Sequence, residues 1–119
     1  MKLEEYLEEW FADETEEVGL YMAMARKAEE EGYPEIARQF RENAIAEAEH
    51  AGIAAELGGK IGNTKENLEK MIGGEDEANS TRLEIAEKQE DPERSYLVTT
   101  ARDEERHKKA LKGLYEEKF

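Results

Sequence analysis

Apolar residues recur along this chain at alternating spacings of three and four, which is the period of one face of an α-helix. Strand-like alternation is scarce, and the dominant residue types, Ala, Glu, Lys, Leu, Arg and Met, all favour helices. Helix-breaking residues gather at Gly32 to Pro34, at Gly58 to Asn63 and at Asp91-Pro92. The pattern therefore predicts an all-α protein with four helices, at about residues 3–31, 34–57, 64–89 and 92–117.

Each predicted inward face is apolar at one or both ends and polar in its middle, where a glutamate stands. In the second and fourth helices a histidine follows three residues later, as Glu47-x-x-His50 and Glu104-x-x-His107, and these are the only two histidines. Three-residue spacing places both side chains on one helix face, so both can reach the same ion. A buried carboxylate is normally excluded, protonated or paired, because burying an unpaired charge is unfavourable.

The first and third predicted helices each supply one more glutamate, Glu14 and Glu75. In antiparallel pairs, the turn near Gly32 brings Glu14 level with the second-helix motif, and the turn near Asp91 brings Glu75 level with the fourth-helix motif. One Glu from each of two helices and Glu-x-x-His from the other two is the ligand set of di-iron and di-manganese carboxylate bundles. Two divalent ions would cancel the four negative charges. The predicted metal ligands are Glu14, Glu47, His50, Glu75, Glu104 and His107.

Composition narrows the function further. The 119 residues include 17 Lys and Arg against 31 Asp and Glu, for a net charge of −14, and no cysteine. One domain over residues 1–119 is the natural count for this length. Thiolate metal sites, iron–sulfur clusters and cysteine nucleophiles are excluded within this sequence, and nucleic-acid binding is disfavoured because acidic surfaces repel phosphate backbones. The first residues do not form a signal peptide and no segment reaches membrane-spanning length, so we expect a cytoplasmic protein without membrane contact.

Several motifs resemble those of the rubrerythrin family of ferritin-like di-iron proteins, at residues 11–14, 46–51 and 101–107 among others, and the resemblance covers nearly the whole chain. The run from Glu17 to Tyr21 is most similar to the reverse-rubrerythrin branch. The resemblance implies a ferritin-like four-helix bundle, the same six ligands by position, two iron ions, and the reduction of hydrogen peroxide or dioxygen. Carboxylate and imidazole ligands also accept manganese and zinc, so the residues alone leave the metal open.

Two departures from the family pattern bear on this function. Rubrerythrins usually carry a cysteine-ligated rubredoxin domain that delivers electrons. This sequence has none, so the resemblance implies a separate, rubredoxin-like donor protein. Classical rubrerythrins also have a second glutamate three residues after the third-helix ligand, where this chain has Ala78. Glu17, which follows Glu14 by three residues, could replace it and is a candidate seventh ligand.

The sequence is compatible with three functions. The leading one is a di-iron peroxidase. The second is a ferroxidase or iron-handling protein that oxidises Fe(II) and passes it on without sustained turnover. The third is a bundle that metal stabilises without any turnover.

The connection between the second and third helices bears on assembly. A ferritin-like bundle needs a long crossover at this point, but Gly58 to Asn63 supplies only six residues. Unwound helix ends or a simple up-down-up-down bundle would resolve the conflict. We favour a third solution, a domain-swapped homodimer in which helices one and two of one chain complete the site with helices three and four of the other.

Overall fold

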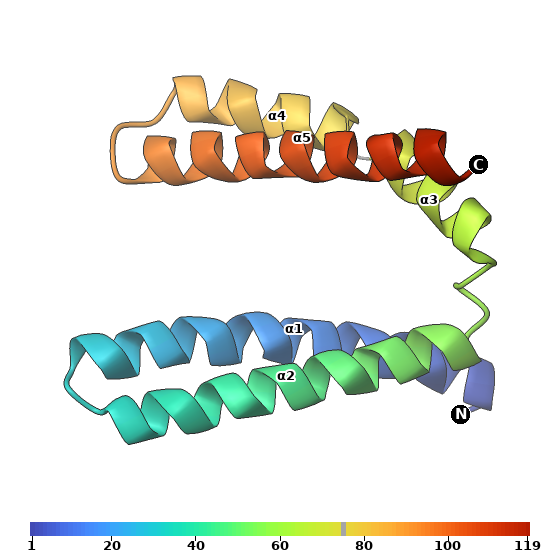
Figure 1. Ribbon diagram of the computed structural model, residues 1–119. Coiled ribbons are helices and arrows are strands. Elements are labelled where there is room, and N and C mark those ends of the chain that lie inside the picture. Colours follow the sequence, from blue (N-terminus) through green and yellow to red (C-terminus); the bar gives the residue numbers. More distant parts are fainter. Residues whose placement is uncertain (75) are drawn as a thin grey trace. The chain divides into compact units, whose positions relative to one another are not determined.

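A computed structural model describes residues 1–74 and 76–119, apart from the side chain of Asp76. The predicted ligand Glu75 lies outside the described residues. The part of the chain that is described contains no strand, and its helices are α1 (Leu3–Glu30), α2 (Pro34–Leu57), α3 (Thr64–Gly73), α4 (Asp76–Glu87) and α5 (Glu93–Lys118) (Figure 1).

The chain divides into two compact units, an N-terminal unit, Met1–Ile61, and a C-terminal unit, Gly62–Phe119. The first contains α1 and α2, and the second contains α3, α4 and α5. The expectation of one domain over residues 1–119 stays a prediction. Among the described residues, no helix is both long enough and apolar enough to cross a lipid bilayer.

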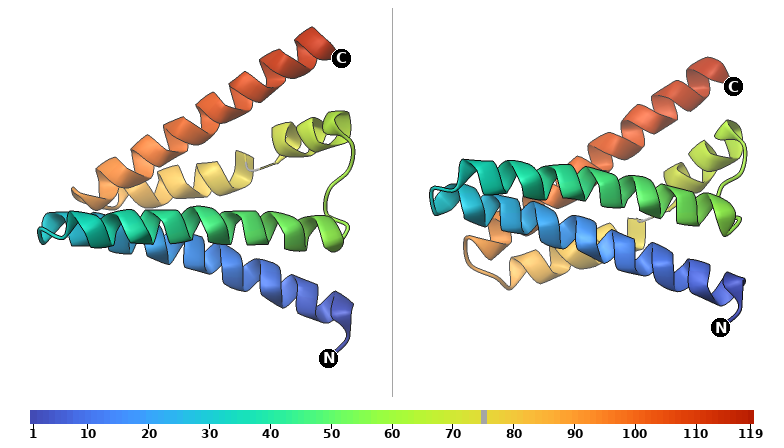
Figure 2. Two further views of the ribbon diagram at one scale, coloured as in Figure 1. Left: turned by 60° about the horizontal axis from the view of Figure 1, so that its bottom comes forward. Right: turned by 90° about the horizontal axis from the view of Figure 1, so that it is seen from below.

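In the N-terminal unit, α1 and α2 run antiparallel and side by side, joined by a tight turn (Figures 1 and 2). The turn follows from Gly32, whose φ of 86° is readily adopted only by glycine. The N–H of Tyr33 donates to the carbonyl of Ala28 at 2.8 Å, which completes a helix-ending motif. Pro34 then begins α2, where its missing N–H has no consequence. The second helix ends in a similar way near Gly59, which has a φ of 73°.

The buried positions of α1 and α2 are alanines, apart from Leu7. Ala25, Ala28 and Ala37 form a buried cluster against which Phe40 packs. Further buried alanines lie along α2 at positions 44, 51, 54 and 55. Small side chains allow a close approach of two helix axes. This approach brings side chains near the middle of α1 within reach of those near the middle of α2.

In the C-terminal unit, α5 packs against both α3 and α4 (Figure 1). The helix predicted at 64–89 is interrupted, because α3 ends at Gly73 and Gly74 has an extended backbone with φ −91° and ψ 166°. Glycine weakens a helix because it loses more conformational freedom than other residues when it is fixed there. Ala86 of α4 and Ala101 of α5 are buried in this unit.

A side-chain cap sets the start of α3, and a side chain that precedes α5 accepts hydrogen bonds from its first turn. Asn63 and Glu66 form a capping box, in which the Asn63 side chain accepts from the Glu66 N–H at 2.9 Å and the Glu66 carboxylate accepts from the Asn63 N–H at 3.0 Å. At α5, Oδ1 of Asp91 accepts from the N–H of Ser95 at 3.0 Å and from its hydroxyl at 2.6 Å. Because α2 ends at Leu57 and α3 begins at Thr64, the six residues Gly58 to Asn63 connect these helices, as predicted.

Candidate metal centre

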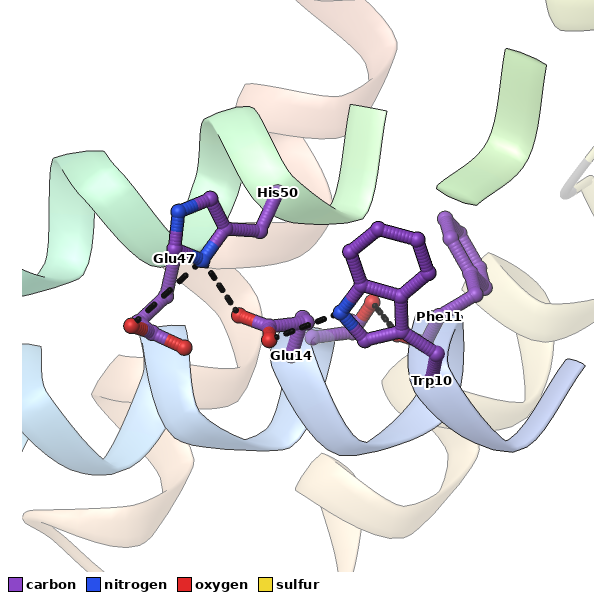
Figure 3. Close-up of polar contacts among 6 residues, drawn as sticks. Trp10, Phe11, Glu14, Glu47 and His50 are labelled. Atoms are coloured by element: carbon purple, nitrogen blue, oxygen red, sulfur yellow. Dashed lines mark hydrogen bonds and ion pairs between the residues drawn. The ribbon is translucent and has the colours of Figure 1, made fainter. Parts of the chain in front are cut away.

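Glu14, Glu47 and His50 meet near the middle of the N-terminal unit (Figure 3). One ligand atom from each of them, a carboxylate oxygen or a ring nitrogen, lies within 4.8 Å of the other two. Nδ1 of His50 is 3.4 Å from Oε2 of Glu14 and 3.7 Å from Oε1 of Glu47. Two atoms that bind one cation at about 2.1 Å are at most about 4.2 Å apart. The three side chains can therefore converge on one ion after small rotations.

The local helices explain this meeting. Glu47 and His50 are three residues apart on α2, so they share one face, and the antiparallel pairing brings Glu14 of α1 to their level. The Glu14 and Glu47 side chains are only 14% and 19% exposed, whereas His50 is 48% exposed. The structure thus places the two carboxylates inside and leaves the imidazole half open to solvent.

Trp10 holds one oxygen of Glu14. Its indole N–H donates to Oε1 at 2.9 Å from one turn earlier on α1 (Figure 3). The other oxygen, Oε2, is buried and accepts no hydrogen bond from any described residue. A cation would satisfy this oxygen, and two carboxylates with an imidazole suit iron, manganese or zinc. Helix periodicity alone does not single out Trp10, although a donor four residues before a predicted ligand is a usable signal.

The two carboxyl groups titrate differently. The pKa of Glu47 is raised to about 7, first by the neighbouring Glu14 carboxyl, then by that of Glu17 and by burial. The pKa of Glu14 is lowered, chiefly by the neighbouring Glu47 carboxyl; burial opposes this, while Trp10 and His50 reinforce it. Without a cation, the pair of carboxyl groups therefore retains a proton up to near neutral pH. A metal ion that binds here must displace that proton.

Glu17, the candidate seventh ligand, lies at the edge of this group. Its side chain is exposed, and it interacts with the Glu47 carboxyl. It does not belong to the three residues whose ligand atoms cluster among the described residues. Ligation by Glu17 stays a prediction.

The second predicted group belongs to the C-terminal unit. Glu104 is half-buried, His107 is exposed, and both line a pocket of about 280 Å³ between α5 and the arm formed by α3 and α4. Met71, Asn79 and Leu111 also line this pocket. The third predicted ligand of this group, Glu75, lies outside the described residues, so the group as a whole stays a prediction.

Comparison with known proteins identifies one matching family model and two similar proteins. A protein-family model described as Rubrerythrin matches residues 5–115. The chain is 42% identical, over 123 aligned positions, to the uncharacterized protein MJ0746 of Methanocaldococcus jannaschii. This alignment covers 99% of this chain and 87% of that protein. The chain is also 38% identical, over 115 positions, to Reverse rubrerythrin-1 of Clostridium acetobutylicum. This alignment covers 92% of this chain and 64% of that longer protein. The family match, together with the all-helical structure of the described residues, confirms the predicted all-α, ferritin-like fold class.

Proposed function

The chain belongs to the rubrerythrin family, and from that premise we propose that it is a di-iron oxidoreductase that reduces hydrogen peroxide. The family and the relative named reverse rubrerythrin support a di-iron protein of the oxidoreductase kind. The observation that carries the proposal is the cluster of Glu14, Glu47 and His50, with its buried and unsatisfied Glu14 oxygen. The proposed ligands are the six residues predicted from the sequence, with dioxygen as an alternative substrate.

The residues of the N-terminal unit prepare this chemistry. When bound, two ferrous ions supply the two electrons that, with two protons, convert one hydrogen peroxide into two waters. Glu14 and Glu47 place negative charge beside the ions, and the Trp10 N–H keeps Oε1 of Glu14 occupied so that Oε2 is left for a cation. The exposed Glu17 interacts with Glu47, so its carboxylate can pass protons from solvent towards the carboxyl pair.

The electrons come, in this proposal, from a separate reduced protein of the rubredoxin kind. The experiment is to purify the protein without air, measure its metal content, and then follow peroxide consumption with reduced rubredoxin. We expect two irons for each chain and sustained turnover. Oxidation of Fe(II) without sustained turnover would support the ferroxidase alternative instead, and neither reaction would support a metal-stabilised bundle.

A matched control is Glu49→Ala. Glu49 directly precedes His50 on α2 but is exposed and lies outside the cluster of three. This variant should keep its metal and its turnover, whereas Glu14→Ala should lose the ion of the N-terminal unit and the turnover. Equal behaviour of the two variants would contradict the assigned site.

We also propose that the protein assembles as the exchanged homodimer. The linker Gly58 to Asn63 spans at most about 20 Å when fully extended. The 24 residues of α2 make a helix about 36 Å long. A crossover along a whole helix exceeds this reach, whereas an exchange of helix pairs between chains avoids the crossover. Light scattering should give the mass of a dimer, and a monomer that still holds two metals at micromolar concentration would contradict exchange.

A further inference from the structure

Asn79 on α4 has a side-chain amide whose two ends lie in different surroundings. Its Nδ2 donates to the backbone carbonyl of Ala101 on α5 at 3.1 Å. Its Oδ1 is buried and accepts no hydrogen bond from any residue that the structure describes. Because a carbonyl oxygen can only accept, the bond to Ala101 requires the NH₂ end there and fixes the orientation of the amide. None of the described protein atoms therefore satisfies this oxygen.

Asn79 lines the same pocket as two of the candidate ligands of the C-terminal unit. It lines the pocket of about 280 Å³ together with Glu104 and His107. It also lines a second pocket of about 150 Å³, formed with Ala78, Arg82 and the same Glu104. Glu104 and Asn79 are thus common to both pockets. An ion held by the Glu-x-x-His pair of α5 would have an Asn79 side chain in its own pocket.

The chemistry of the amide oxygen suits a metal ion. A buried acceptor without a partner is unfavourable, and native proteins keep few of them without a bound water, ion or functional reason. An amide oxygen is a hard, neutral donor of the kind that divalent cations accept alongside carboxylates. Because it is neutral, it adds a ligand without adding a fifth negative charge to the four proposed glutamates.

We propose that Oδ1 of Asn79 is a direct ligand of the ion held by Glu104 and His107, in addition to the six residues predicted from the sequence. The proposal rests on the proposed function, because it requires that ion. It also gives a role to the departure at Ala78, where the pattern of classical rubrerythrins has a glutamate. The next residue along the chain supplies an oxygen ligand from α4, four positions after Glu75 in the sequence.

The test is a titration of the metal-free full-length protein with Co²⁺, followed by calorimetry and by the visible absorption of the bound ion. The wild type should bind two equivalents. Asn79→Leu should weaken one of them by about 10-fold to 100-fold, which is the loss typical even of residues that only hold a ligand. It should also change the Co²⁺ absorption, because the ion loses a ligand. Asn79→Asp keeps an oxygen in place and should bind both equivalents at least as tightly as the wild type.

Folding and control variants separate this role from a structural one. Metal-free Asn79→Leu should be at least as stable as the wild type, because it removes a buried, unsatisfied oxygen, and the Ala101 carbonyl keeps its helical partner. Should this variant fail to fold by circular dichroism, the smaller Asn79→Ala takes its place in the same comparison. The control is Asn43→Leu on α2, because Oδ1 of Asn43 already accepts from Gln39 at 2.8 Å. It should leave both equivalents unchanged.

The outcomes distinguish a failure of ligation by Asn79 from a failure of the proposed function. Two tight equivalents and a wild-type spectrum in Asn79→Leu would overturn ligation by Asn79 and leave the proposed function intact. A wild-type protein that binds no Co²⁺, Fe²⁺ or Mn²⁺ would overturn the proposed function and this ligand with it. A selective loss of one equivalent in Asn79→Leu, restored in Asn79→Asp, is the result that the geometry predicts.

Discussion

The two units carry the same Glu-x-x-His motif, on α2 and on α5, but the helices that face these motifs differ. In the N-terminal unit the facing helix α1 runs unbroken for 28 residues and carries Glu14 near its middle. In the C-terminal unit the facing arm is divided at Gly73 and Gly74 into two shorter helices, α3 and α4. The motif decides which side chains share a face. The continuity of the facing helix decides whether a third ligand, such as Glu14, already lies beside the motif in the metal-free protein.

The two units also differ in the kind of buried oxygen that lacks a hydrogen bond. Among the described residues, two side-chain atoms are buried without a hydrogen bond, Oε2 of Glu14 and Oδ1 of Asn79, one in each unit. The first belongs to a carboxylate that is already clustered with a second carboxylate and an imidazole. The second belongs to a neutral amide. A cation is attracted more strongly to the first, so the N-terminal unit should take up the first equivalent of metal.

The largest expected effect comes from removing the two histidines separately. His50→Ala should abolish the tighter binding phase, and His107→Ala should abolish the weaker one, because each removes an imidazole from a different group. Both should lose peroxide turnover and keep their helices. Calorimetry with Co²⁺ and circular dichroism measure these effects. Loss of the same phase in both variants, or full metal content in the double variant, would contradict the division between the units.

Metal removal should lower the melting temperature. An ion at one hundred times its dissociation constant stabilises the folded state by about 2.7 kcal/mol for each site. For a chain of this length, that corresponds to a shift of about 10 °C. The wild type should show the shift of two sites and His107→Ala that of one, as measured by calorimetric scans with and without metal. Equal melting temperatures of the metal-free and metal-loaded wild type would contradict metal binding at these sites.

Much of the fold could be predicted, because the turns are encoded locally. The bounds of α1, α2 and α5 differ from the predicted ones by no more than one residue, since glycine, proline and capping residues stand at their ends. The break at Gly73 and Gly74 was harder to predict, because the helical period continues through the two glycines. The buried contact was also missed in part. Alanines fill it, whereas a pattern of large apolar residues favours Met24, which is 45% exposed.

The grouping of the candidate ligands in the N-terminal unit could also be predicted, but the hydrogen bonds around the ligands could not. Spacing placed Glu47 and His50 on one face, and antiparallel pairing placed Glu14 at their level, where the structure brings the three together. The hydrogen bonds of Trp10 and Asn79 were not predicted. They depend on side-chain rotamers and on the close approach of neighbouring atoms, which the period of a helix does not specify.

Removing the indole donor tests how far the N-terminal cluster is organised in advance. Trp10→Phe keeps an aromatic ring beside Tyr6 but removes the N–H that holds Oε1 of Glu14. The tighter Co²⁺ phase should weaken by about 10-fold or more, because Glu14 then samples other orientations. The weaker phase should not change. Tyr6→Phe is the control, since it keeps the ring stack and the indole bond. Equal affinities in Trp10→Phe and the wild type would show that the hydrogen bond has no such role.

A pH titration of the metal-free protein should show the raised pKa of Glu47. Its folded-state pKa of about 7 exceeds its ordinary value of 4.5, so the folded protein holds a proton that the unfolded chain has released. The unfolding free energy should therefore fall as the pH rises from about 4.5 to 7. The lowered pKa of Glu14 acts in the opposite sense, but only below the ordinary value.

Glu47→Gln isolates this contribution from the general repulsion of an acidic chain. The variant should show a flatter dependence of melting temperature on pH between about 5 and 7, because its amide does not titrate there. A slope as steep as that of the wild type would assign the pH dependence to other groups. Metal-loaded wild type should lose stability at the acidic end of this window, because protons then compete with the ion for Glu47.

The smallest effect is expected for Glu17→Ala, which also decides between the two roles considered for this residue. Glu17 is exposed and contributes less than Glu14 to the raised pKa of Glu47. Its removal should lower the pKa of Glu47 only part of the way to the ordinary value, as a carbon-13 NMR titration of the Glu47 carboxyl would show. Both equivalents of Co²⁺ should still bind. Stopped-flow oxidation of the iron-loaded variant by peroxide should stay close to the wild type, whereas Glu14→Ala should be far more damaged. If Glu17→Ala instead keeps its metal but oxidises slowly or gives an unstable diferric product, Glu17 is a ligand of the oxidised centre, and the N-terminal unit supplies four ligands rather than three.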